Sequence, residues 1–156
     1  MTYAKNTKVP VAHSRAAIEQ LIARHGATRF ANGWEDGAIS IMFEMRTRRV
    51  RFYLPLPQAD EKRFLRDGNG KVRTAEARGR AHDTAVRERW RALLLVIKAK
   101  LESVETGVTT FEEEFLAHII LPTGGTIGEW AIPLMNEAYR SGTAMPPLLG
   151  AGPGPA

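Results

Sequence analysis

Residues 74–105 carry the longest amphipathic pattern in the chain and predict a single long helix. At about 100° per residue, one face collects seven apolar side chains: Val86, Trp90, Leu93, Leu94, Ile97, Leu101 and Val104. A helix needs such a stripe to cover a core. The far side is also partly apolar, with Ala92, Leu95, Val96 and Ala99. We therefore expect this central helix to be covered on more than one side.

Three segments before this helix predict an antiparallel meander. Residues 38–45 and 49–54 each alternate apolar with other side chains, which is the period of a half-buried strand. Residues 27–34 form a shorter strand candidate, and turn residues separate the three segments. Pro55 and Pro57 end the last strand because proline cannot donate a hydrogen bond to a ladder. Residues 58–73 then read as a mobile basic loop.

The remaining segments predict shorter helices. Residues 1–12 are polar and contain Pro10, so we expect a flexible arm that is extended or loose. Ser14 is expected to cap a first helix that ends at Gly26. Two capping boxes, begun by Thr110 and Thr126, predict two helices after the central one. Trp90 and Trp130 are expected in the core, and Trp34, beside a turn, on the surface.

The predicted fold class is therefore α+β. An N-terminal helix, a three-stranded antiparallel meander, a long central helix and two shorter C-terminal helices form one domain over residues 13–149. Residues 150–156, rich in glycine and proline, are expected to be a disordered tail.

Composition excludes several classes of function. The chain has 156 residues and no cysteine, which excludes disulfides, cysteine nucleophiles and the usual zinc fingers. No apolar run is long enough for a membrane span, so we expect a soluble intracellular protein without a membrane partner. The net charge of +5 favours a polyanionic partner, because each neutralised phosphate releases counterions.

Basic residues cluster between the predicted hairpin and the central helix, and they are the strongest candidate site. Arginines in the hairpin could follow a phosphate backbone beside the basic loop, while Tyr53 offers a stacking surface. The candidate nucleic-acid-binding residues are Arg46, Arg48, Arg49, Arg51, Tyr53, Arg63, Arg66, Lys71, Arg73, Arg80, Arg87, Arg91 and Lys98. The alternative is solvated charge, in which helical arginines pair with Glu76, Asp83, Glu88 or Glu102.

Acidic residues and histidines give weaker signals. Glu112, Glu113 and Glu114 lie in the first turn of a predicted helix, where the helix dipole and capping alone favour carboxylates. Glu114 and His118 have the spacing of a metal pair, but no second cluster completes a site. No catalytic set can be assembled from the dispersed histidines. The sequence thus favours a non-enzymatic protein with no catalytic residues, metal or cofactor.

Three segments carry a resemblance to a known group of proteins. They are RWRALLLVIKAKLE at residues 89–102, FEEEFL at 111–116 and MPPLL at 145–149. The chain resembles, over about residues 9–149, small uncharacterised proteins of phages, prophages and integrated elements. The resemblance transfers no catalytic residue. It implies the cytoplasm of a bacterial host, where small basic proteins often serve DNA replication, recombination or counter-defence.

Three functional hypotheses follow. The leading one is a non-enzymatic mobile-element protein that binds nucleic acid, with DNA favoured over RNA, through the basic hairpin, loop and helix flank. The second is a protein-binding, anti-CRISPR-like inhibitor of a host defence nuclease, whose partner is a host nucleic-acid-binding protein. The third, a small metal-dependent nuclease, lacks the required carboxylate cluster. The alanine-rich side of the central helix leaves a homodimer open.

Overall fold

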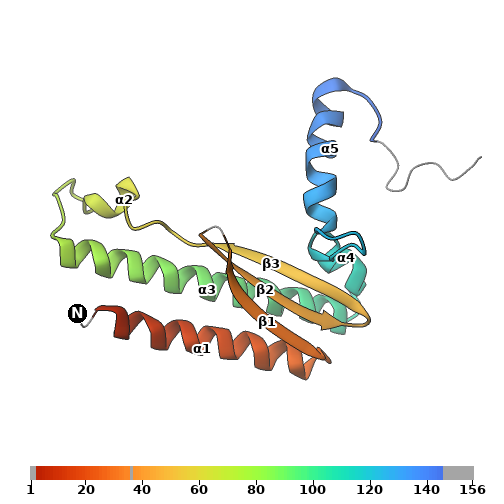
Figure 1. The fold of residues 1–156 in the computed structure, drawn as a ribbon, viewed down its shortest axis with the longest axis horizontal. Helices are drawn as coiled ribbons and strands as arrows, with labels where there is room; N and C mark the ends of the chain where they lie inside the picture. Colours follow the sequence, from red (N-terminus) through yellow and green to blue (C-terminus); the bar gives the residue numbers. More distant parts are fainter. Residues whose placement is uncertain (1–2, 36, 146–156) are drawn as a thin grey trace, which may run out of the picture.

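The three strands form one antiparallel sheet, and the helices precede and follow it in the predicted order (Figure 1). The computed structural model describes residues 3–35 and 37–145. Its elements are α1 (Tyr3–Arg24), β1 (Arg29–Glu35), β2 (Ala38–Met45), β3 (Arg48–Pro55), α2 (Lys62–Leu65), α3 (Ala75–Glu105), α4 (Phe111–Phe115), the 3-10 turn η1 (Leu116–His118) and α5 (Ile127–Ser141). The predicted α+β class is confirmed. Among the described helices, none has the length and hydropathy needed to cross a lipid bilayer.

The sheet is a meander in the order β1-β2-β3. Ile41 of β2 lies opposite Asn32 of β1 and Phe52 of β3, so the predicted alternation places Ile39, Ile41, Phe43 and Met45 on one face. Arg46 and Thr47 make the turn between β2 and β3 with φ angles of 50° and 62°. Two successive positive φ angles are the geometry of a two-residue type I′ hairpin turn, whose twist matches that of the strands.

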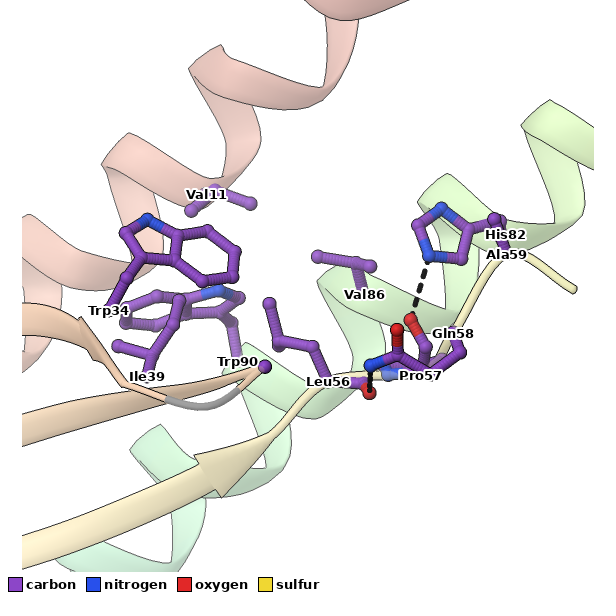
Figure 2. Close-up of a pocket in the computed structure, with 11 residues that line it drawn as sticks. Val11, Trp34, Ile39, Leu56, Pro57, Gln58, Ala59, His82, Val86 and Trp90 are labelled. Carbon is purple, nitrogen blue, oxygen red and sulfur yellow. Dashed lines mark hydrogen bonds between the residues drawn. The ribbon is translucent and has the colours of Figure 1, made fainter. Parts of the chain in front are cut away.

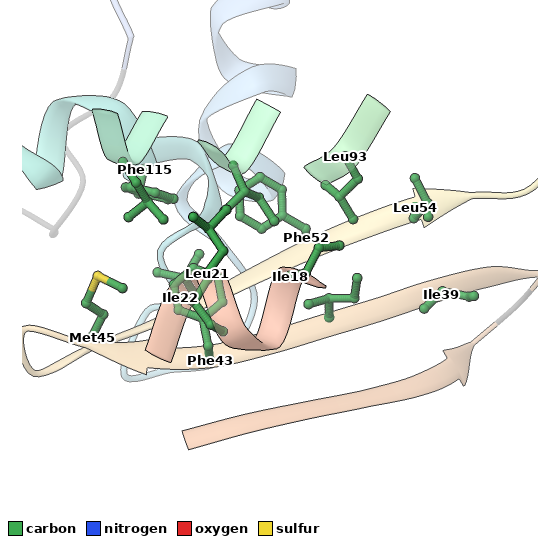
Figure 3. Close-up of a cluster of buried hydrophobic side chains, with 14 of the residues drawn as sticks. Ile18, Leu21, Ile22, Ile39, Phe43, Met45, Phe52, Leu54, Leu93 and Phe115 are labelled. Carbon is green, nitrogen blue, oxygen red and sulfur yellow. The ribbon is translucent and has the colours of Figure 1, made fainter. Parts of the chain in front are cut away.

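One hydrophobic core lies between that sheet face and the parallel helices α1 and α3 (Figure 3). Two contacts show that the helices run parallel. Val11 and Val86 line one pocket toward their N-termini, and the ring of His25 lies 3.1 Å from the carboxylate of Glu105 at their C-termini. The predicted stripe of α3 supplies Val86, Trp90, Leu93, Ile97 and Leu101, all buried. Trp90 is 2% exposed, so its expected place in the core is confirmed.

Helix α1 begins much earlier than predicted. The backbone is helical from Tyr3, so the prediction of an extended arm over residues 1–12 is wrong for residues 3–12. A proline removes one backbone hydrogen bond from a helix, yet its φ angle is compatible with helical geometry. Val11 is partly buried against the core, which favours continuing the helix through Pro10. The tail predicted at residues 150–156 lies outside the described residues.

The far side of α3 is more open than predicted. Leu95 and Val96 are 58% and 45% exposed, and Ala92 and Ala99 are exposed as well. Our expectation that this side is covered is wrong within the described part of the chain. Both ends of α3 lie where the sequence predicted them. The Thr74 hydroxyl accepts from the amide of Ala77 at 3.2 Å, and Gly107 follows the helix with a φ of 77°.

Both predicted capping boxes are present. Thr110 and Thr126 each accept from the amide of the glutamate three residues later, Glu113 and Glu129, and that glutamate accepts from the cap amide. The helix that Thr110 opens is shorter than predicted and gives way to η1. The chain then extends along β3, where the amide of Ile120 donates to the carbonyl of Arg49 at 2.8 Å.

Helix α5 stands away from the sheet and makes its main contacts with η1 (Figure 1). Its first turn is held closely: a Cβ on Gly128 would lie 2.7 Å from the carbonyl oxygen of Ala117. Pro133 lies within the helix without ending it. Because α5 leaves the body after this turn, Trp130 is only partly buried, and its predicted place in the core is wrong.

Candidate nucleic-acid interface

The structure divides the predicted basic site into three groups. The hairpin group contains Arg46, Arg48, Arg49, Arg51 and Tyr53, on β3 and the turn before it. The loop group contains Arg63, Arg66, Lys71 and Arg73, in and around α2. The helix stripe contains Arg80, Arg87, Arg91 and Lys98, on α3.

The hairpin group and the loop group lie at opposite ends of α3 (Figure 1). The guanidinium of Arg46 lies 5.8 Å from the centre of the Phe111 ring, near the C-terminal end of α3. The segment before α2 lies near the N-terminal end, where the ring of His82 donates to the carbonyl of Pro57 at 2.8 Å. Residues 82 and 105 of a helix are roughly 35 Å apart at about 1.5 Å per residue. The prediction of one surface formed by hairpin and loop is therefore wrong.

Arg51 has a structural role that its position on the sheet did not reveal. Its Nη2 donates to both carboxylate oxygens of Glu129, at 2.9 and 2.8 Å, and links β3 to the first turn of α5. Its guanidinium also lies 4.9 Å from the centre of the Tyr53 ring. The Arg51 side chain is only 18% exposed. Arg51 is therefore poorly placed to contact a phosphate, and one face of Tyr53 is covered.

The remaining arginines of the hairpin group are exposed. Arg49 lies opposite Glu44 across the strand pair, and Glu44 also lies 3.7 Å from Arg29 in an ion pair. Among the described residues, the guanidinium of Arg48 donates only to the hydroxyl of its neighbour Thr47, at 3.3 Å. The tip is thus a small basic surface of its own, partly balanced by Glu44.

The loop group is built into a defined turn, whereas the sequence predicted a mobile loop. The carboxylate of Asp67 accepts from the amides of Asn69 and Lys71, both at 2.9 Å. Arg66 donates to the carbonyl of Gly70 at 2.7 Å, which closes the same turn.

The other members of the loop group differ in how freely they can contact a ligand. Arg73 donates to the carbonyl of Arg63 at 3.2 Å, and Arg63 pairs with Glu61 at 2.6 Å. The ammonium group of Lys71 makes no hydrogen bond or ion pair with another described residue, and the residue is exposed. Lys71 is therefore the loop-group cation most available to an external anion.

The helix stripe keeps its predicted alignment along α3. Arg87 donates to the hydroxyl of Thr84 at 3.1 Å, and Arg91 and Lys98 are exposed, with no bond to another described side chain. Among the described residues, neither Arg91 nor Lys98 forms an ion pair with the acidic residues that could have neutralised its charge. His82, which contacts the loop segment, lies about 160° around the helix from Arg80 at about 100° per residue. Stripe and loop therefore occupy opposite flanks of a helix only about 10–12 Å wide.

Positive charge is concentrated in the segment that contains the loop group and most of the helix stripe. Residues 60–91, which we call the basic end, hold ten lysines and arginines against six aspartates and glutamates. This segment alone therefore supplies +4 of the chain's net +5.

The acidic candidates have structural partners. Glu114 accepts from the hydroxyl of Thr109 at 2.9 Å and lies 3.4 Å from Lys100, and the Thr109 hydrogen bond is the main reason its pKa lies below the usual range. His118 stacks on Phe52 with ring centres 4.0 Å apart. Within the described residues, no group of three or more histidines, aspartates and glutamates could hold a metal ion.

His118 gives a prediction for stability against pH. Burial, and secondarily the charge of Lys100, lower the pKa of His118 below the ordinary value of about 6.5. The unfolded chain therefore binds a proton at His118 more readily than the folded chain does, so acidification favours unfolding. We expect the free energy of unfolding, measured by urea titration, to fall as the pH is lowered from 7.5 to 5.5. His118→Gln should flatten that slope, and an unchanged slope would contradict this assignment.

Comparisons of the chain with protein-family models, curated proteins and solved structures find no match. A function must therefore be argued from the geometry and the charge of the described residues.

Proposed function

We propose that the protein is a non-enzymatic accessory protein of a phage or other mobile element, and that it binds nucleic acid through its basic end. The observation that carries the proposal is the concentration of +4 of the net charge within residues 60–91. An excess of this kind, along one helix and the loop before it, is the electrostatic footprint of phosphate binding. The hairpin tip lies outside this proposed interface.

The helix stripe supplies the geometry for phosphate contacts. Arg80 and Lys98 are 18 residues apart on one flank, which corresponds to about 27 Å along a straight helix. Duplex DNA carries one negative charge per about 1.7 Å of its axis, so a stripe of this length meets several phosphates. Contacts of this kind fix position and read no bases, so we expect little sequence preference.

The test is fluorescence anisotropy with labelled single-stranded and duplex DNA of random sequence. Five phosphate contacts, four from the helix stripe and one from Lys71, predict that log K falls with log salt concentration at a slope of about −4.5 for duplex DNA. Micromolar or tighter binding at low salt that weakens in this way would support the proposal. Absence of binding at low salt would overturn it.

A protein-binding inhibitor is the second candidate, and helix α5 favours it. Ile132, Met135 and Tyr139 are 50%, 40% and 86% exposed on a helix that stands out from the body. Exposed apolar side chains on one element are typical of protein–protein contact sites. This candidate predicts a stoichiometric complex with a host nuclease or CRISPR effector that is insensitive to salt, and no affinity for free nucleic acid.

A further inference from the structure

An apolar pocket of about 450 Å³ lies at the N-terminal end of the helix pair (Figure 2). No residue of the helix stripe or of the hairpin tip lines it. Its walls come from four parts of the fold: α1, the adjoining ends of β1 and β2, the segment after β3, and α3. Val11, Leu56, Pro57 and Val86 provide aliphatic surface, and Trp34 and Trp90 provide indole rings. A volume and lining of this kind are those of a small-molecule site.

Trp90 contributes a polar group that the protein itself does not use. The residue is 2% exposed, and its indole Nε1 is buried with no hydrogen-bond partner among the described residues. Figure 2 shows the nitrogen-bearing edge of the ring toward the middle of the pocket residues. A buried donor without an acceptor costs about 1–3 kcal/mol. A ligand with an acceptor at this position would recover that free energy.

Two other side-chain donors of the pocket already have acceptors. The ring of His82 donates to the carbonyl of Pro57, and the side-chain amide of Gln58 donates to the carbonyl of Leu56 at 3.2 Å. The pocket thus offers one unused donor in otherwise apolar surroundings. This pattern selects against a polyhydroxylated or charged ligand, since each further buried polar group would lack a partner.

Trp34 adds a stacking surface at the mouth. It is 74% exposed on an edge strand, although it belongs to the class of residues that carries the largest apolar surface. Its exposed place beside the turn was predicted from the sequence, whereas its position in the same pocket as Trp90 was not. An exposed indole next to a pocket can cover one face of a flat ligand.

We propose that this pocket binds a small, planar, largely apolar aromatic molecule that carries one hydrogen-bond acceptor. The ring lies against Trp34, and the acceptor receives the Nε1–H of Trp90. None of the cations of the loop group or the helix stripe lines the pocket, although His82, Val86 and Trp90 belong to the same segment of α3. The pocket can therefore be tested without nucleic acid.

The test uses isoquinoline, a flat bicyclic ring with one nitrogen acceptor, and naphthalene, which has the same shape and no acceptor. The three tryptophans give three indole N–H signals in a proton–nitrogen correlation spectrum. We expect saturable shifts of the Trp90 and Trp34 signals with isoquinoline and none at Trp130. The Trp90 proton should move downfield with isoquinoline, because it enters a hydrogen bond, and should not do so with naphthalene.

Two variants place the binding in the pocket. Ala59 is exposed at the mouth, so Ala59→Phe should weaken isoquinoline binding at least about tenfold without disturbing the core. Trp34→Ala should weaken it as well, and Ala92→Phe, on the far side of α3, is the matched control that should not. The proposal is overturned if no saturable shift occurs, if Ala59→Phe and Ala92→Phe bind equally, or if the Trp90 proton responds alike to both ligands.

Discussion

Replacement of Phe115 by alanine is expected to lower the free energy of unfolding by about 3–5 kcal/mol. Phe115 is fully buried between the sheet and the start of η1. Its ring meets the edges of Phe43 and Phe52 at 6.1 and 6.2 Å and stacks on Phe111 at 4.6 Å. The truncation removes apolar contacts on all three sides and leaves a cavity that rigid strands cannot fill. Urea unfolding followed by circular dichroism measures the loss.

Leu116 provides the matched control for this prediction. It is the next residue along the chain and is 51% exposed, so Leu116→Ala removes a side chain of similar character outside the core. Surface substitutions usually change stability by less than about 0.5 kcal/mol. Equal losses of stability in Phe115→Ala and Leu116→Ala would contradict the burial of Phe115 between the sheet and η1.

Local patterns in the sequence were sufficient for most of the fold. The apolar residues predicted to face the core, in the stripe from Val86 to Leu101 and at alternate positions of β2 and β3, are buried in the structure. Both capping boxes form, because the hydroxyl of Thr110 or Thr126 and the glutamate three residues later need only the geometry of one helical turn. These features depend on neighbours within a few residues, which a sequence displays directly.

Features that depend on distant parts of the chain were not predictable in the same way. Pro10 favoured a break, but packing of Val11 against the core continues α1. Arg51 looked like its neighbours on β3, and only the approach of Glu129, 78 residues later, gives it a different role. The sequence likewise could not show that β3 runs back along α3 and thereby places the hairpin tip far from the loop.

The pocket, too, depends on contacts between distant segments that local sequence patterns do not reveal. The exposure of Trp34 and the burial of Trp90 were each predicted from local patterns. Their place in one pocket depends on how α1, the sheet and α3 meet. A composition or spacing rule contains no such information, so the unused donor of Trp90 was visible only in the structure.

The proposed interface predicts that charge at the basic end matters more than equal charge at the hairpin tip. The double variant Lys71→Gln with Arg91→Gln removes one cation from the loop group and one from the helix stripe. Both side chains are exposed and make no bond to another described residue, so the fold should not change. Loss of two phosphate contacts should lower the salt slope of duplex binding by about 2 and the affinity at low salt by about tenfold or more.

The matched control is Arg48→Gln with Arg49→Gln at the hairpin tip. It also lowers the net charge from +5 to +3, but at the C-terminal end of α3, roughly 20 Å along the helix from Arg91 and farther from the loop group. Because the general attraction of a basic protein for DNA depends on net charge, it should weaken equally in both variants. A local interface should weaken only in the first. Equal losses would therefore show that binding is a property of the whole charged molecule, and a larger loss in the hairpin variant would move the interface to the tip.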